Sequence, residues 1–202
     1  ADCQSCKGCS KCCHDMVDTI ILNPLDVFLL SKGLGKRMEQ MMDKEITLKA
    51  VNGIVLPHLK MTEEGNCCPF LNKEERCSIH SFRPDLCRLF PLGRVYENGD
   101  FAYFLQTGQC DHVRTKIKVE KWIDTPNLKE HKKFIIRWHN LVQRAEELRW
   151  DERSEDENFG RNLSMVLLLK FYFSRYDLEK DFFSQFYEAA GKLEEVLFAT
   201  II

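Results

Sequence analysis

Apolar positions at helical spacing dominate the last third of the chain. From residue 124 the pattern becomes helical: Thr125-Pro126 is a start signal, and a single apolar face follows it. That face consists of Phe134, Ile135, Trp138, Leu141, Val142 and Ala145. We expect this helix to run to about Arg149. Two further, broadly apolar helices are predicted at 159–176 and 178–200, so the tail is predicted to be a three-helix bundle.

Shorter helices are predicted near the start of the chain. Asn23 and Pro24 have the residue types of a helix N-cap and of the first helical position, and this helix is expected to end near 33–35. Met38, Met41 and Met42 follow at helical spacing, which predicts a second short helix. We interpret the methionine stripe as part of the core rather than as a metal-binding set.

Strand patterns lie between these helical regions. Residues 46–62 are rich in Ile, Val, Leu and Thr, and they predict one or two short strands. Residues 93–106 contain two strand-like segments on either side of the turn Glu97-Asn98-Gly99-Asp100, which predicts a β-hairpin. A small sheet is therefore expected in the first half of the chain.

Composition and charge restrict the function classes. The chain has 202 residues, 44% of them hydrophobic and 30% charged, which is typical of a globular protein. The formal net charge of −2 provides no basic field, so nucleic-acid binding is not expected. The apolar run 165–173 is interrupted by Lys170 and is shorter than the roughly 20 residues of a membrane span, so no membrane insertion is expected. No basic segment followed by an apolar stretch opens the chain, and the expected location is cytoplasmic.

Cysteine divides the chain in two. There are ten cysteines, and none of them lies beyond residue 110; they are Cys3, Cys6, Cys9, Cys12, Cys13, Cys67, Cys68, Cys77, Cys87 and Cys110. The predicted fold is α+β, mainly α. A cysteine-rich metal-binding half with short strands and a hairpin, residues 1–112, is expected to precede a C-terminal helical bundle, residues 113–202, that packs on it.

The spacing of the cysteines favours metal binding over disulfides. Cross-links between near neighbours constrain little of the unfolded chain, whereas C-x2-C spacing brings thiolates to one centre in both zinc and iron–sulfur sites. Cys3, Cys6, Cys9 and Cys13 reproduce the spacing of a bacterial ferredoxin run, although His14 stands where that run has proline and the partner motif is absent. One zinc ion takes four ligands, so this many cysteines indicate several metal ions or a polynuclear cluster.

A second cysteine group carries the specific motifs Cys68-Pro-Phe-Leu, Cys77-Ser-Ile-His and Arg83-Pro-Asp-Leu-Cys87-Arg-Leu-Phe-Pro91. Together with the run from Cys6 to Cys13, they resemble the CxxCxxCC cysteine-cluster family of zinc- or iron-chelating domains, which includes YkgJ-type proteins and flagellin lysine N-methylases. The resemblance covers residues 6 to about 112. It implies metal or iron–sulfur binding by Cys6, Cys9, Cys12, Cys13, Cys68, Cys77, Cys87 and Cys110.

Residues around these thiols differ in what they are expected to do. Arg83 and Arg88 are predicted to contact the bound cofactor, because their charge can offset that of several thiolates. The resemblance leaves the roles of the extra thiols Cys3 and Cys67 open. His14 and His80 lie beside cysteines and are candidate additional ligands. The other histidines are expected to be structural or exposed; they are His58, His112, His131 and His139.

Two functions follow from these thiols. The first is an iron–sulfur protein with one or two [4Fe–4S] clusters that performs redox or cluster-assisted, methyl-transfer-like chemistry on a protein substrate or with a redox partner. The second is a structural zinc protein that acts as an interaction module. The chain has no G-x-G-x-x-G motif, so a Rossmann-type site for S-adenosylmethionine or a dinucleotide is not indicated. Whether the chain is an enzyme, either a redox enzyme or one similar to a protein-lysine N-methyltransferase, stays open.

Overall fold

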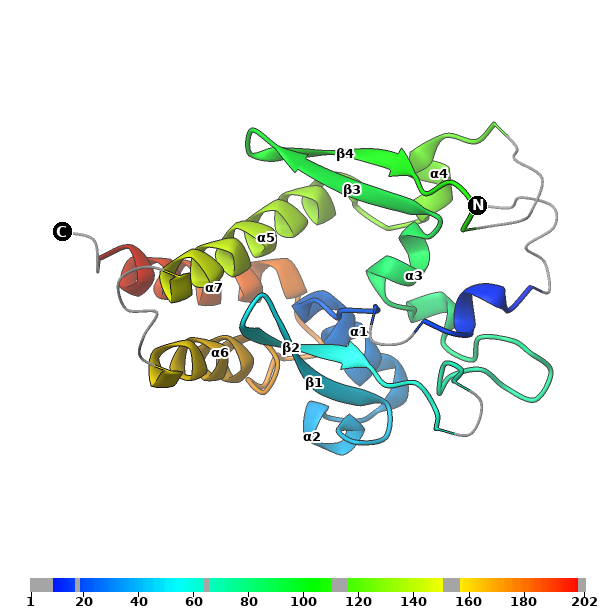
Figure 1. Ribbon diagram of the computed structural model, residues 1–202, viewed down its shortest axis with the longest axis horizontal. Helices are drawn as coiled ribbons and strands as arrows, with labels where there is room; N and C mark the ends of the chain where they lie inside the picture. The colour runs from blue at the N-terminus through cyan, green and yellow to red at the C-terminus, as the bar shows by residue number, and fades with distance from the viewer. Residues whose placement is uncertain (1–8, 17–18, 64–65, 110–115, 151–156, 200–202) are drawn as a thin grey trace.

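The structure is a computed structural model, and it describes residues 9–16, 19–63, 66–109, 116–150 and 157–199. It has the expected α+β, mainly α architecture, with two separate two-stranded antiparallel sheets and a set of C-terminal helices. The segments that carry the cysteines gather at one end of the molecule, and the far ends of the C-terminal helices lie at the other (Figure 1).

The first helix begins and ends where its sequence predicts. In α1 (Pro24–Leu34), the side chain of Asn23 accepts a hydrogen bond from the amide of Asp26, and the amide of Asn23 donates to the Asp26 carboxylate in return, at 3.0 and 2.9 Å. This reciprocal capping satisfies two amides that the helix itself leaves unpaired. The short helix α2 (Met38–Met41) follows, and Met38 and Met41 are buried, which confirms their place in the core.

Both predicted strand regions form hairpins. β1 (Ile46–Val51) pairs with β2 (Ile54–Leu59), and β3 (Leu92–Glu97) pairs with β4 (Asp100–Leu105). At the second turn Asn98 and Gly99 have φ angles of 51° and 75°, the left-handed geometry that two-residue hairpin turns require. The turn predicted from the sequence is confirmed.

Four short helices lie among the cysteines and after the second hairpin. They are η1 (Lys11–Cys13), η2 (His80–Phe82), α3 (Asp85–Leu89) and α4 (Val119–Ile123).

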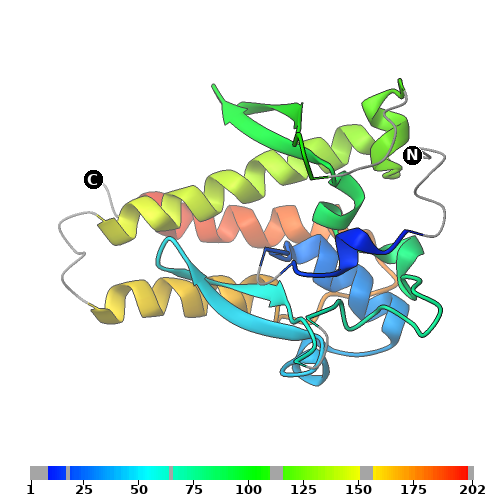
Figure 2. The ribbon, with the colours of Figure 1, turned by 45° about the vertical axis from the view of Figure 1, so that its right-hand side comes forward.

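The C-terminal helices are α5 (Leu128–Trp150), α6 (Glu157–Phe171) and α7 (Phe182–Ala199), which run side by side with β2 against α6 (Figure 2). The prediction of helices at 159–176 and 178–200 was wrong about the break between them. Asp177 accepts a hydrogen bond from the amide of Glu179, and Asp181 accepts one from the amide of Ser184, at 3.1 and 2.7 Å. These carboxylates stabilise a turn and then cap α7, so the connection is longer than its apolar residues suggested.

Aromatic side chains join the helices into a core. Phe134, Phe171 and Phe186 are fully buried, and the ring centroids of Phe134 and Phe186 lie 4.8 Å apart. Phe28 of α1 reaches the same cluster, with its ring 5.2 Å from that of Phe182. One hydrophobic core therefore runs from α1 to α7. The division of the chain near residue 112 stays a prediction. None of the helices in the described ranges is long and apolar enough to cross a lipid bilayer.

Arg149 at the end of α5 lies between two glycines. A Cβ atom on Gly53, in the β1–β2 turn, would overlap the Arg149 side chain, and one on Gly160 of α6 would overlap its guanidinium group. Alanine is favoured over glycine inside a helix by roughly 0.5–1 kcal/mol. In the natural chain, we expect the overlap with Arg149 to cancel the stability that Gly160→Ala would otherwise add. In an Arg149→Ala background, Gly160→Ala should raise the free energy of unfolding by this amount. Urea unfolding of the four proteins measures the difference, and equal effects in both backgrounds would contradict the contact.

Candidate metal centre

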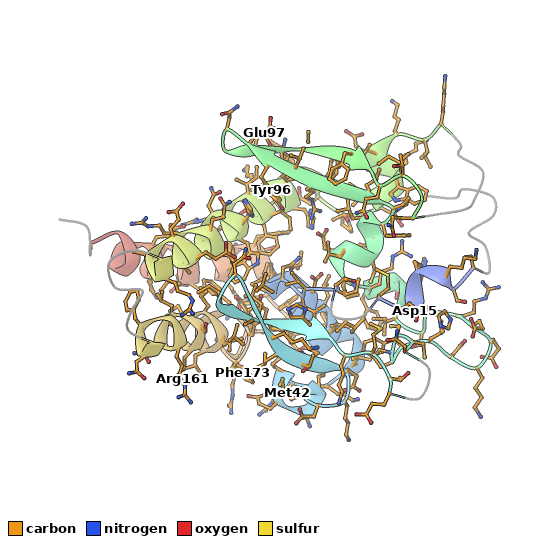
Figure 3. The ribbon with its side chains drawn as sticks, viewed as in Figure 1. Asp15, Met42, Tyr96, Glu97, Arg161 and Phe173 are labelled. Carbon is orange, nitrogen blue, oxygen red and sulfur yellow. The ribbon has the colours of Figure 1, made fainter. Side chains whose placement is uncertain are left out.

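Two cysteine segments pair through their backbones. The amide of Cys68 donates to the carbonyl of Cys13 at 2.7 Å, and the amide of Asp15 donates to the carbonyl of Asn66 at 2.9 Å. These bonds flank an antiparallel bridge between His14 and Cys67. Asp15 marks this pairing in Figure 3, close to the end of the molecule where the cysteine segments meet.

This pairing separates the neighbouring residues onto two faces. Side chains alternate along paired strands, and residues directly opposite each other share a face. Cys13 and Cys68 therefore lie on one face, and His14 and Cys67 lie on the other. Cys67 has its own neighbour, because its Sγ lies 3.2 Å from the hydroxyl of Thr62.

A tight loop brings Cys77 back to the segment that carries Cys68. The side chain of Asn72 accepts hydrogen bonds from the amides of Glu74 and Arg76 at 3.1 and 2.8 Å, which turns the chain. Leu71 then bridges to Cys77 in antiparallel geometry. Cys77 consequently lies beside the segment that carries Cys68, although nine residues separate the two in sequence.

The fourth thiol comes from α3. Pro84 is the N-cap of this helix, and Cys87 lies in its middle. Burial raises the pKa of Cys87 well above its usual range, and nearby Cys68 raises it further. Cys87 itself is half-buried.

Electrostatic coupling shows which thiols gather. Burial raises the pKa of Cys68 to about 11, with contributions from Cys77, Cys67 and Cys12, and burial likewise raises the pKa of Cys77, with a contribution from Cys12. A hydrogen bond from the Cys13 thiol lowers the pKa of Cys12 to about 6 and holds that of Cys13 high. Cys67 also acts on its neighbour Cys68, but the pairing places its side chain on the other face, opposite His14. The gathered thiols are therefore Cys12, Cys13, Cys68, Cys77 and Cys87. Thiols crowded into a partly buried site resist ionising together unless a cation compensates their charge.

The structure brings part of the predicted ligand set together, and metal binding by these residues stays a prediction. The five gathered thiols are among the eight predicted ligands, Cys9 is half-buried one turn before Cys12, and Cys6 and Cys110 lie outside the described residues. The seven described cysteines are all free thiols. In the described part of the chain, no three Cys, His, Asp or Glu side chains are yet arranged to hold a metal ion. The soft donor set fits zinc or iron.

The two arginines predicted to contact a cofactor have different surroundings. The charge of Arg83 favours the thiolate forms of Cys12 and Cys77, and its guanidinium donates to Nε2 of His80. Arg88 donates to the carbonyl oxygens of Arg83, Ser81 and Asp124 at 3.2, 2.5 and 3.1 Å. Arg83 is therefore placed to act on the thiols directly, whereas Arg88 holds the loop that carries it. Their contact with a cofactor stays a prediction.

His14 contacts a residue that the sequence analysis did not single out. Its Nε2 lies 3.1 Å from the carboxylate of Glu75, which also accepts a hydrogen bond from the hydroxyl of Ser10. The hydrogen bonds from Ser10 and His14 lower the pKa of Glu75. This contact joins the loop 72–77 to the first cysteine segment. Nothing in the sequence links Glu75 to His14, because 61 positions separate them.

A buried polar cluster beside Cys87 was also not foreseen. It consists of Asp26, Asp85, Arg94 and His131, and the side chains of Asp85 and Arg94 are each only 6% exposed. His131, expected to be structural or exposed, is buried and bonded to Asp85. Burying charged side chains costs free energy of desolvation, which their pairing only partly offsets. The stability of the fold alone therefore does not account for this cluster.

Comparison with known proteins agrees with this site. The model of the CxxCxxCC family, described as a "putative zinc- or iron-chelating domain", matches residues 5–111, which contain all the gathered thiols. No solved structure matches the chain. The match covers more than half of the 202 residues, and the chain therefore belongs to the CxxCxxCC family, whose described property is metal binding.

Proposed function

We propose that this protein binds an iron–sulfur cluster through its gathered cysteines and uses it for electron transfer. One observation carries the proposal: backbone contacts bring cysteines from separate segments together, because the amide of Cys68 donates to the carbonyl of Cys13 at 2.7 Å and Leu71 bridges to Cys77. A tetrahedral zinc site and a [4Fe–4S] cluster each take four protein ligands, so a fifth thiol indicates more than one centre. The ferredoxin-like spacing of the first cysteine run favours iron–sulfur over zinc. With Cys6, Cys9 and Cys110, which the family resemblance implies, eight thiolates could hold two four-ligand centres.

The surroundings of the thiols support a redox role. Among the five gathered thiols, Cys12 is exposed and Cys68 is buried, with only 7% of its surface exposed. The site therefore extends from the surface to the core, and a redox partner could approach it at Cys12. The charge of Arg83 would offset the negative charge of ligated thiolates, which is one of the ways in which proteins set the reduction potential of a cluster. When bound, the cluster supplies one-electron redox chemistry.

Methyl transfer is the second chemistry that the resemblance implies. It would need a separate site for a methyl donor, and the sequence carries no glycine-rich nucleotide motif. Electron transfer needs no such site. We therefore propose electron transfer with a protein partner as the function, and a structural zinc site as the outcome that would replace it.

The test is the content of iron, zinc and acid-labile sulfide per chain in anaerobically purified protein. The expected result is iron and sulfide in equal amounts, with broad visible absorption that bleaches on addition of dithionite. Zinc without sulfide, and without visible absorption, would overturn the proposal and make the site structural. Zinc-reconstituted protein of the same preparation is the control for absorption that does not come from a cluster.

A further inference from the structure

The helix that carries Cys87 cannot hold its own position. With five residues, α3 is far shorter than the helices that persist alone in water, and its N-cap Pro84 provides no side-chain hydrogen bond. A thiolate on such a helix is aimed by whatever surrounds the helix. The buried cluster of Asp26, Asp85, Arg94 and His131 surrounds its first turn.

Asp26 of α1 supplies the missing cap. Its Oδ1 accepts a hydrogen bond from the amide of Asp85, the first residue of α3, at 2.7 Å, while its Oδ2 accepts from the amide of Asn23 at 2.9 Å. Asp26 is buried, with only 2% of the residue's surface exposed. The same side chain therefore caps α1 from within and α3 from outside, and it fixes the start of one helix relative to the other.

Asp85 itself is held from two further elements. Arg94 of β3 donates two hydrogen bonds to its carboxylate, at 2.5 and 3.0 Å, and Nε2 of His131 in α5 lies 3.1 Å from Oδ1. A two-bond arginine–carboxylate pair fixes orientation as well as distance. At the other end of α3, the indole of Trp122 in α4 donates to the carbonyl of Phe90 at 3.1 Å. Both ends of the five-residue helix are thus tied to other elements.

We infer that Asp26, Asp85, Arg94 and His131 are positioning residues for the metal centre, because their hydrogen bonds fix the helix that presents Cys87. The inference rests on the proposed function, since it needs a metal bound at the gathered thiols. Apolar residues of similar size could fill this space as stably as the buried charges do, so stability alone does not explain the cluster. Aiming one thiolate does, and outer residues that orient a ligand commonly change metal affinity by about 10- to 100-fold.

The experiment compares two matched arginine substitutions in the full-length protein. Arg94→Lys keeps the charge but cannot form the two-bond pair with Asp85. Arg137→Lys makes the same change in the pair between Arg137 of α5 and Glu194 of α7, whose hydrogen bonds measure 3.0 and 2.6 Å. The readout is the rate at which metal passes to a colorimetric chelator, with bathophenanthroline disulfonate for iron and pyridylazoresorcinol for zinc. Far-ultraviolet circular dichroism shows that both variants are folded.

Arg94→Lys is expected to release metal roughly ten times faster or more, and Arg137→Lys at the rate of the natural chain. His131→Gln, which keeps a donor that can reach Asp85, should release metal more slowly than His131→Leu. Equal release rates for all variants would overturn the positioning role while leaving the proposed function intact. Zinc in place of a cluster, with the same order of release rates, would overturn the iron–sulfur proposal and keep this inference. A chain that takes up neither iron nor zinc would overturn both.

Discussion

Cys68→Ser is expected to lower the metal content of the protein to about half or below, whereas Cys67→Ser is expected to leave it unchanged. The two residues are adjacent, but the antiparallel pairing of 13–15 with 66–68 turns their side chains to opposite faces. Cys68 shares its face with Cys13, and Cys67 shares its face with His14. If one of two four-ligand centres is lost, metal per chain should fall to about half or below in Cys68→Ser.

The measurement is iron and zinc content by elemental analysis of both variants, purified in the same way as the natural chain. Each variant exchanges one sulfur for one oxygen at neighbouring positions, so Cys67→Ser controls for the chemical change itself. A loss of metal in Cys67→Ser as large as that in Cys68→Ser would contradict the assignment of the two faces. Unchanged metal in both would remove Cys68 from the ligand set.

Removing the metal is expected to loosen the cysteine segments much more than the C-terminal helices. The segments 9–16 and 66–89 consist of short helices and loops that single buried side chains such as Phe70 and Ile79 attach to the core, whereas the aromatic cluster around Phe134 and Phe186 holds the long helices α5, α6 and α7. Metal that binds only the folded site stabilises it by about 2.7 kcal/mol when its concentration is about 100 times the dissociation constant. We therefore expect amide exchange in these segments to accelerate by roughly 100-fold or more after chelation.

Hydrogen exchange followed by mass spectrometry, with and without chelator, measures this difference. The amides of Asp15 and Cys68 are informative, because both donate across the pairing of the two cysteine segments. Peptides from α5 and α7 are the internal control. Equal acceleration in the cysteine segments and the C-terminal helices would contradict a local effect and indicate that the metal stabilises the whole molecule.

Local signals in the sequence predicted the elements that depend on local chemistry. Asn23-Pro24 and Asn98-Gly99 form the cap and the turn that they predict, because both structures are decided within four residues. The helix break between α6 and α7 could not be placed, since Phe173 and Tyr176 continue the apolar pattern while the carboxylates of Asp177 and Asp181 bond to the backbone. Side-chain bonds to the backbone outweighed hydrophobic periodicity there.

The site was predictable in its composition and not in its arrangement. Spacing and family motifs identified the thiols, but the faces of Cys67 and Cys68 depend on pairing with residues more than fifty positions away. The same holds for Asp26 and Asp85, which are 59 positions apart and meet only because α1 packs beside α3. A single sequence does not show which distant residues contact each other, so the polar cluster could be found only in the structure.

The contact between Phe28 and Phe182 affects how this chain can be divided. A fragment that ends near residue 112 would keep the thiols but expose Phe28 and Val27 of α1, which α7 and its neighbours otherwise cover. Exposed apolar faces of this kind promote association. The C-terminal helices therefore keep the segment that carries the thiols soluble, because they cover the apolar face of α1. Any chain that carries the segment without these helices must cover α1 in another way.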